Sequence, residues 1–226
     1  MSNANAEAWG LDKVVDFFDS HRASTTEVYN SEWHFLKDRL KDGMTILDVG
    51  CAQGGFASVA SEHIKDFRYT GIDINARMIA LARERHPQHR FHHVAEGDFS
   101  VLGDKRFDLV LVLGILHLHE SWRRTIAQAW THTGGALLLD LRESEFPTIE
   151  DKTRSHFRMD FNGGDERHTG TVLPYNIINS AEAQETVLTT CRGARSLLHY
   201  GYSHAVSGAA MTPIPTVTTN AYLVER

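Results

Sequence analysis

Short apolar runs alternate with stretches of helical periodicity through the middle of the chain. The runs typical of strands are MTILDV, RYTGIDI, RFHHVAEGD with its exit loop, FDLVLVLG and GALLLDL. Between them, apolar residues recur every three or four positions, most clearly in residues 54–64 and 121–132. Strands that alternate with helices over roughly 100 residues predict an α/β fold with a doubly wound, mostly parallel sheet.

The residues before this alternation predict a helical cover. A first helix is expected over about residues 11–19. A second is expected from Ser24, because Glu27 three residues later completes a capping-box pattern, and Gly43 is expected to end it. We therefore expect residues 1–43 to form an N-terminal helical lid on a single domain of residues 44–226.

The alternation breaks over residues 142–179. Turn formers in FNGGDERHTG separate two β-prone runs, SHFRMDF and GTVLPY, which predicts a hairpin that projects as a substrate-side insertion. Beyond it, a helix is expected to begin at Asn179 or Ser180. ARSLLHYGYS and TTNAYLVER then read as an antiparallel pair of strands that completes a seven-stranded sheet.

Composition narrows the class of partners. A chain of 226 residues can bury one sizeable core, and its net charge of −6 opposes non-specific binding to nucleic acid. Cys51 and Cys191 do not make a disulfide framework. No apolar run approaches membrane-spanning length, and MSNANAEAWG lacks the apolar core of a signal peptide. We expect a cytoplasmic protein with a small-molecule ligand and no nucleic-acid or membrane partner.

The first strand leads into a loop of small residues that is preceded by an acid. Asp48 stands just before Gly50, Ala52 and Gly54. Loops of this kind hold ligands at the carboxyl ends of parallel strands, and dinucleotides place a pyrophosphate there. The charge of Asp48 disfavours a pyrophosphate, but a carboxylate can accept hydrogen bonds from a ligand's ammonium group, directly or through water. S-adenosylmethionine carries an ammonium and a sulfonium and no phosphate, so the pattern favours it over NAD.

At this point the sequence resembles the class I S-adenosylmethionine-dependent methyltransferases, over about residues 45–141. LDVGCAQGG resembles their first motif, with Ala52 in place of the middle glycine, and FDLVLVLGILHL resembles their fourth. The resemblance implies S-adenosylmethionine as the cofactor. It implies that Asp73 binds the ribose hydroxyls, and that Asp98 accepts from the adenine amino group. The other cofactor contacts expected are Phe99, Ile74, Leu113 and Tyr29.

Two histidines follow the fourth strand in LGILHLHES. His117 matches a leucine-histidine pattern of the family, and either His117 or His119 could act as a base because histidine titrates near neutral pH. The turn lacks an Asn-Pro-Pro-Tyr-type tetrapeptide and has no acid of the kind that binds Mg²⁺ in catechol-type enzymes. A metal-independent enzyme is therefore expected.

Substrate contacts are expected from outside the cofactor core. The candidates are Trp33, His156, Arg158, Tyr175 and Tyr202. We expect methyl transfer to a small molecule, with oxygen somewhat favoured over nitrogen as the acceptor because histidines crowd the expected mouth of the site. Two alternatives stay open: a non-catalytic S-adenosylmethionine-binding protein or partner subunit, and, less favoured, an NAD-binding oxidoreductase.

Overall fold

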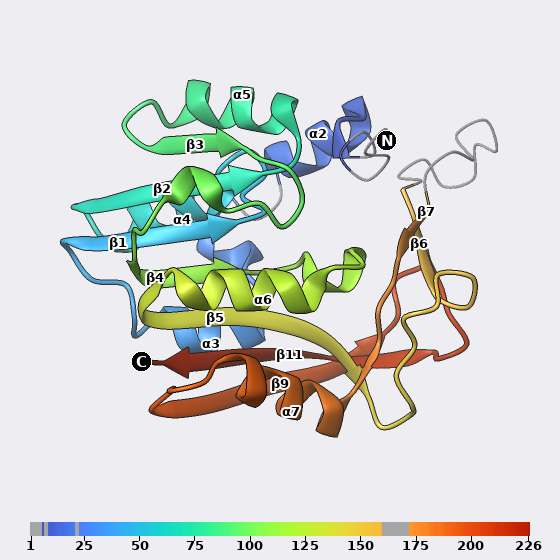
Figure 1. Ribbon diagram of the computed structural model, residues 1–226. Helices are drawn as coiled ribbons and strands as arrows, with labels where there is room; N and C mark the ends of the chain where they lie inside the picture. Colours follow the sequence, from blue (N-terminus) through green and yellow to red (C-terminus); the bar gives the residue numbers. More distant parts are fainter. Residues whose placement is uncertain (1–5, 7–8, 21–22, 160–171) are drawn as a thin grey trace.

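The computed structural model describes residue 6 and residues 9–20, 23–159 and 172–226, and its centre is one twisted sheet (Figure 1). The strand order is β3-β2-β1-β4-β5-β11-β9. The bounds are β1 Met44–Val49, β2 Phe67–Asp73, β3 Arg90–His93, β4 Phe107–Val112, β5 Thr133–Ser144, β9 Ser196–Ala205 and β11 Thr216–Glu225. The first five strands run parallel, while β11 is antiparallel to both β5 and β9. The α/β fold with an antiparallel C-terminal pair is confirmed.

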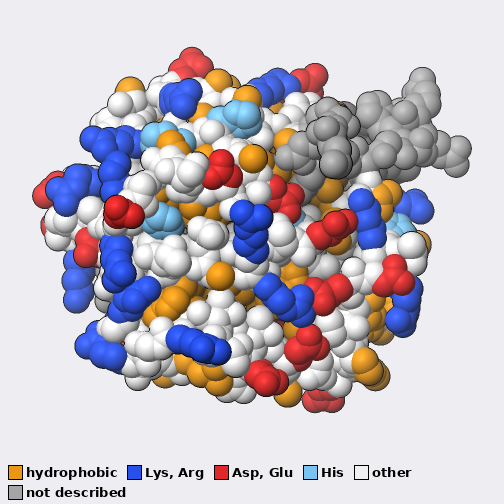
Figure 2. All heavy atoms as spheres, viewed as in Figure 1, with side chains coloured by type: hydrophobic (Ala, Val, Ile, Leu, Met, Phe, Trp, Pro, Cys, Tyr) orange, Lys and Arg blue, Asp and Glu red, His pale blue; other side chains and the backbone are white. Residues whose placement is uncertain are grey.

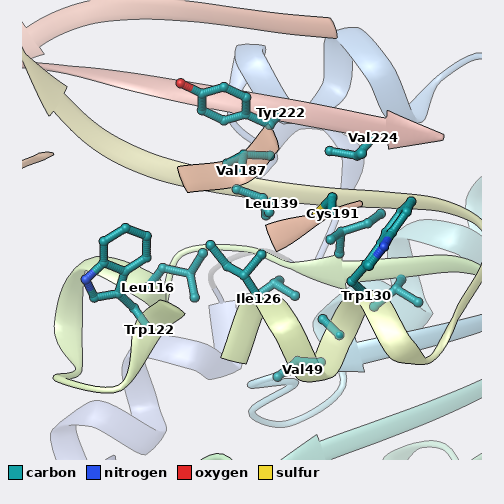
Figure 3. Close-up of a cluster of buried hydrophobic side chains, with 14 of the residues drawn as sticks. Val49, Leu116, Trp122, Ile126, Trp130, Leu139, Val187, Cys191, Tyr222 and Val224 are labelled. Carbon is teal, nitrogen blue, oxygen red and sulfur yellow. The ribbon is translucent and has the colours of Figure 1, made fainter. Parts of the chain in front are cut away.

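Helices cover both faces of this sheet because alternate strand residues point to opposite sides. On one face, Leu137 and Leu139 of β5 share a buried cluster with α6 (Trp122–Thr131) and α7 (Ser180–Thr190), shown in Figure 3. On the other face, Leu138 shares a cluster with α3 (Asn30–Leu36), α4 (Gly55–His63) and α5 (Ala76–Arg85). The continuous apolar run of β5 therefore reflects burial on both faces, as expected of an internal strand.

The second N-terminal helix differs from the sequence prediction. The chain forms a 3-10 turn, η1 (Thr25–Glu27), and the α-helix α3 starts only after Tyr29. The Ser24 side chain makes no capping hydrogen bond. The capping box of α3 is formed by Tyr29 and Glu32. The Thr25 side chain hydrogen-bonds Glu62 and His63 of α4, which holds this turn against the domain and accounts for the later start.

The expected projecting hairpin is present as a small second sheet. β6 (His156–Arg158) pairs antiparallel with β7 (Val172–Pro174), and β10 (Ala210–Met211) pairs with β6 (Figure 1). The expected turn FNGGDERHTG lies outside the described residues. β5 continues to Ser144, and the short strand β8 (Ile178–Asn179) pairs with its end, which adds an eighth strand to the main sheet.

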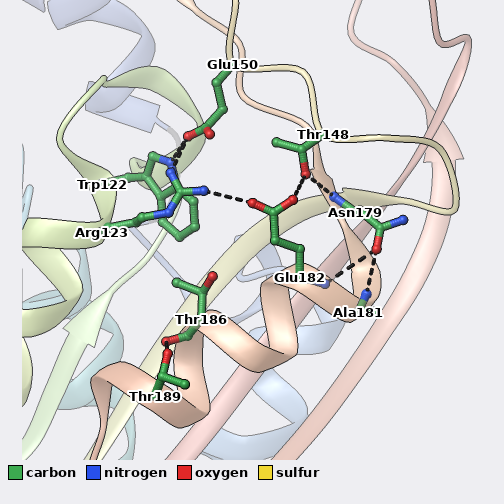
Figure 4. Close-up of polar contacts among 9 residues, drawn as sticks. All are labelled: Trp122, Arg123, Thr148, Glu150, Asn179, Ala181, Glu182, Thr186 and Thr189. Carbon is green, nitrogen blue, oxygen red and sulfur yellow. Dashed lines mark hydrogen bonds and ion pairs between the residues drawn. The ribbon is translucent and has the colours of Figure 1, made fainter.

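Polar side chains fasten the segment after β5 to the helices. Asn179 caps α7 by accepting from the backbone amides of Ala181 and Glu182 (Figure 4). It is one of the two residues at which the sequence predicted this helix to begin. Arg123 of α6 contacts Glu150 at 2.5 Å and Glu182 at 3.0 Å. On the face shown in Figure 2, basic and acidic side chains are interspersed.

No helix in the described part of the chain is long and apolar enough to span a bilayer.

The glycine at position 71 in β2 is expected to be required for packing behind the first loop. A Cβ there would come within 2.6 Å of Cys51 Sγ and 2.7 Å of Phe91 Cδ1. Gly71→Ala should therefore lower the free energy of unfolding by about 1–3 kcal/mol, measured by urea denaturation. The matched control is Gly208→Ala, since a Cβ at Gly208 meets nothing within 4 Å, and its effect should stay within about 0.5 kcal/mol. Equal stability of the two variants would contradict the prediction.

Candidate functional site

A pocket opens at the carboxyl ends of β1, β2 and β4, where an open parallel sheet binds ligands. Its walls come from the loops that follow these strands and β3, and from the segment around α2 (Asp12–Ser20). Lining residues that the sequence predicted are Gly50, Ala52, Asp73, Ile74, Asp98, Phe99, Leu113 and His119. Most of the predicted cofactor residues are thus brought together by the topology of the sheet.

The loop after β1 turns through three residues with left-handed backbone. Gly50, Ala52 and Gly54 have φ of 77°, 45° and 83°. A Cβ on Gly50 would lie 2.7 Å from Ile115 Cγ2, and one on Gly54 would lie 2.9 Å from the His86 ring. Glycine is therefore required at both positions by conformation and by space. Gly54 does not line the pocket among the described residues; it precedes α4 as its N-cap and shapes the loop.

Asp73 at the end of β2 is bonded to both neighbouring segments. Its Oδ2 accepts from the Ala52 amide at 2.9 Å, and its Oδ1 accepts from the Asn75 amide at 2.8 Å. Burial raises the pKa of the Asp73 carboxyl, and these two backbone hydrogen bonds oppose that rise. Each oxygen keeps lone pairs for a further donor, so a rigidly held carboxylate faces the pocket.

The described wall of the pocket carries three acids and neither lysine nor arginine. The acids are Asp73, Glu96 and Asp98. Burial, and after it the charges of Asp73 and Asp48, raise the pKa of the Cys51 thiol in the loop. The potential at the glycine loop is therefore negative, which is unfavourable for a pyrophosphate and favourable for a cationic ligand.

Asp48, expected to accept from a ligand's ammonium directly or through water, lies behind the described pocket wall. It is 2% exposed, accepts a hydrogen bond from the Tyr69 hydroxyl, and is not among the described lining residues. A direct bond from Asp48 to a ligand in the pocket is therefore not supported. Its charge still acts on the loop through space, as the effect on Cys51 indicates.

The loop after β3 forms one end of the pocket. Asp98 is exposed and accepts from the Ser100 amide at 2.9 Å; this hydrogen bond and that of the Ser100 side chain lower the pKa of its carboxyl. Phe99 is buried, and its ring stacks on His132 with centroids 5.8 Å apart. With Ile74 on the opposite loop, these residues lie where the sequence led us to expect a clamp for a planar ring.

The two histidines after β4 have different surroundings. His119 lines the pocket, and its Nδ1 lies 3.3 Å from Glu96 Oε1. His117 does not line it among the described residues; its ring meets the Tyr175 ring edge-on, with centroids 5.5 Å apart. Only one of the two base candidates is therefore in the pocket wall, while the other faces the insertion.

A second polar cluster lies next to the pocket, and we call it the β5 cluster: Asp140, Arg142, Tyr29, Tyr175 and Tyr202. Arg142 is 5% exposed, contacts Asp140 at 2.5 Å and hydrogen-bonds Tyr175. Asp140 Oδ1 also accepts from the amide of Gly114, a pocket residue. Burial raises the pKa of both the Tyr175 and the Tyr202 phenol. The cluster brings three predicted aromatic residues together around a buried cation.

Tyr29, expected from the sequence to contact the cofactor, lies in the β5 cluster and outside the described pocket wall. The guanidinium of Arg142 lies 5.8 Å from the Tyr29 ring centroid, and Tyr29 does not line the pocket among the described residues. Of the expected substrate residues, Trp33 packs against the His63 ring at 4.8 Å. His156 and Arg158 lie on β6 in the small sheet and do not reach the described pocket wall.

Sequence reasoning missed several residues of the pocket. Trp9 and Phe18 from the N-terminal segment line it, and Gln53 holds this segment by donating to the Val15 carbonyl at 2.7 Å. Glu96, which also lines the pocket, and Arg142, in the adjacent β5 cluster, were not among the predicted site residues. An acid two residues before Asp98 and an arginine at the end of a buried strand were the available signals.

The fold is that of the class I methyltransferases. Residues 47–135 match a family model described as a methyltransferase domain, which confirms the resemblance drawn from the motifs. Among solved structures, the 1,6-didemethyltoxoflavin-N1-methyltransferase of Burkholderia thailandensis aligns with a TM-score of 0.60 at 15% identity, over 97% of this chain and 86% of that chain. At that identity the likeness establishes the fold alone.

Two curated relatives match the central part of the chain. The phthiotriol/phenolphthiotriol dimycocerosates methyltransferase of Mycobacterium tuberculosis is 34% identical over 88 residues, 38% of this chain and 32% of that protein. The fatty-acid O-methyltransferase of Mycolicibacterium smegmatis is 38% identical over 80 residues, 34% of this chain and 29% of that protein. The matched region thus spans about a third of the length of these relatives.

The hydrogen bond between Tyr69 and Asp48 is expected to stabilise the fold. Tyr69→Phe leaves a buried carboxylate without its hydroxyl donor, so the free energy of unfolding should fall by about 1–3 kcal/mol in urea denaturation. Tyr200→Phe is the matched control, because Tyr200 is 44% exposed on β9 and its change should stay within about 0.5 kcal/mol. If Tyr69→Phe is as stable as the parent, this bond does not account for the burial of Asp48.

Proposed function

We propose that the protein binds S-adenosylmethionine in the pocket and transfers its methyl group to a small molecule. The observation that carries the proposal is the acid-lined pocket at the glycine loop. It has three carboxylates and no lysine or arginine among its described lining residues. A sulfonium and an ammonium suit this potential, while a dinucleotide pyrophosphate does not. The match of residues 47–135 to a methyltransferase domain supports the same ligand.

Asp73 is the proposed ligand of the ribose hydroxyls. Its two oxygens each accept one backbone amide, which orients the carboxylate and leaves it lone pairs for a ligand in the pocket that it lines. Phe99 and Ile74 are proposed to flank the adenine, and Asp98 to accept from its amino group. Leu113 and the Gly50–Gly54 loop would pass beside the methionine part. The walls contributed by Trp9 and Phe18 would exclude water from the bound cofactor.

Transfer requires the acceptor's lone pair to attack the methyl carbon in line with the carbon–sulfur bond, whose electrons stay on sulfur. Much of the rate of such a reaction comes from holding the two reactants in this geometry. We favour a hydroxyl acceptor over an amine, with His117 taking the hydroxyl proton on an imidazole nitrogen. The position of His117 beside Tyr175, on the side of the insertion and the β5 cluster, supports this choice.

The substrate class is supported only at a coarse level. One matched relative is a fatty-acid O-methyltransferase, and one structural neighbour is an N1-methyltransferase of a heterocycle. Both act on small molecules, which supports a small-molecule acceptor here. Tyr175 and Tyr202 in the β5 cluster are the proposed acceptor contacts. Trp33, His156 and Arg158 have less support, because Trp33 packs on His63 and the other two lie in the small sheet.

Cofactor binding is the first test. Calorimetric titration should give micromolar affinity for S-adenosylhomocysteine and no binding of NAD. Asp73→Ala should weaken S-adenosylhomocysteine binding by about 2–3 kcal/mol, the scale of hydrogen bonds to a charged group. Asp104→Ala, an exposed acid outside the pocket, should leave the dissociation constant unchanged. Binding of NAD without binding of S-adenosylhomocysteine would overturn the proposal, and an unchanged constant in Asp73→Ala would remove Asp73 from the ribose site.

Catalysis is the second test, and it distinguishes an enzyme from a protein that only binds the cofactor. With an acceptor found by screening for release of S-adenosylhomocysteine, turnover should persist in EDTA, because we propose no metal. His117→Ala should lower turnover by about 10²–10⁴-fold with S-adenosylhomocysteine affinity nearly intact. Turnover should also fall as histidine becomes protonated at low pH. A mild loss with a flat pH profile would favour an already nucleophilic acceptor such as a neutral amine.

A further inference from the structure

Glu96 and Ser121 both lie beside the Nδ1 edge of the His119 ring. Its Nδ1 lies 3.3 Å from Glu96 Oε1 and 3.5 Å from Ser121 Oγ, and Ser121 Oγ donates to the same Glu96 oxygen at 2.7 Å. A carboxylate can only accept hydrogen bonds, so the contact with Glu96 favours the neutral tautomer that carries its proton on Nδ1. Nε2 is then an acceptor with a fixed direction.

Nε2 has no hydrogen-bond partner in the described part of the chain, although it is buried. His119 nevertheless lines the pocket, and its side chain is 8% exposed. An unpaired buried acceptor costs free energy that a ligand donor in the pocket would recover. Because His119 lines the pocket and Nδ1 faces Glu96, a ligand in the pocket is a source of such a donor.

The neighbours of His119 identify which end of the ligand it faces. Glu96 and Gly97 belong to the loop that continues into Asp98 and Phe99, and Ser121 lies directly before α6. Thr125, one turn into α6, lines the pocket as well. These residues form the end of the pocket to which the proposed function assigns the adenine ring. His117, by contrast, faces Tyr175.

We infer that His119 is a cofactor-recognition residue: its Nε2 accepts a hydrogen bond from the exocyclic amino group of the purine, and Glu96 is the positioning residue that fixes the tautomer. The inference rests on the proposed function, since it needs S-adenosylmethionine in this pocket. It assigns the two histidines to different tasks. His119 selects a 6-amino purine, and His117 remains the candidate base.

The test compares two ligands that differ at that one group. S-adenosylhomocysteine carries the 6-amino donor, whereas S-inosylhomocysteine carries a 6-oxo acceptor. Calorimetry on the full chain should show that the parent prefers S-adenosylhomocysteine. His119→Ala should reduce this preference by about threefold to tenfold, the range of a single hydrogen bond. His117→Ala should leave the preference unchanged.

A second variant tests the role of Glu96. Glu96→Leu removes the acceptor for Nδ1–H, so the proton can move to Nε2 and turn that atom into a donor. The preference should then shift toward S-inosylhomocysteine, whose oxygen can accept. The tautomer itself can be read without any ligand from the nitrogen chemical shifts of His119 in NMR spectra, with Nδ1 protonated in the parent and Nε2 in Glu96→Leu.

Three results would overturn the inference. Equal weakening of both ligands in His119→Ala would mean that the ring only fills space. Unchanged binding of both ligands, with loss of turnover, would make His119 the base. Failure of the parent chain to bind S-adenosylhomocysteine would refute the proposed function together with the inference, and this outcome is visible in the parent alone.

Discussion

The pocket depends on the carboxylate of Asp73, which joins the ends of two neighbouring strands. It accepts from the amide of Ala52 in the first loop and from the amide of Asn75 at the start of α5. A left-handed alanine costs about 1–2 kcal/mol in isolation. The bond from its amide to a buried charge is of similar size and offsets that cost. The shape of the loop and the orientation of the acid therefore stabilise each other.

A second carboxylate, Asp140, connects the pocket to the segment after β5. It accepts from the Gly114 amide in the pocket wall and pairs with Arg142, which in turn bonds Tyr175 in the insertion. A buried ion pair adds little net stability compared with apolar residues of the same size. We therefore interpret this pair as a device that fixes position. It sets the turn Leu113–Ile115 relative to the aromatic side chains of the β5 cluster.

The sequence predicted what depends on local pattern and on the order of elements. Periodicity located the strands, and Asp73 could be found because its place is set by the end of β2. Tertiary pairing decided the rest. Asp48 hydrogen-bonds Tyr69, which is 21 residues away in the sequence. Thr25 hydrogen-bonds Glu62, which is 37 residues away, and α3 begins after this turn. Such contacts leave no periodic signal, so the sequence did not predict that the Tyr29 ring would lie next to Arg142.

The separation of His117 from His119 follows from the backbone between them. Two residues apart on a strand would share a face, but His117 lies in the 3-10 turn η3 (Leu116–Leu118) and His119 follows it in extended conformation. Asn176 stabilises this change of direction. Its backbone N–H donates to the His117 carbonyl at 2.8 Å, and its side-chain Nδ2 donates to the carbonyls of Leu116 and His119. Asn176 comes directly after Tyr175, which contacts His117 and Arg142. The same short stretch of chain therefore orients the residue proposed to recognise the cofactor and the residue proposed to act on the acceptor. Because both histidines are fixed through one set of hydrogen bonds, a shift of the insertion would move the two halves of the site together.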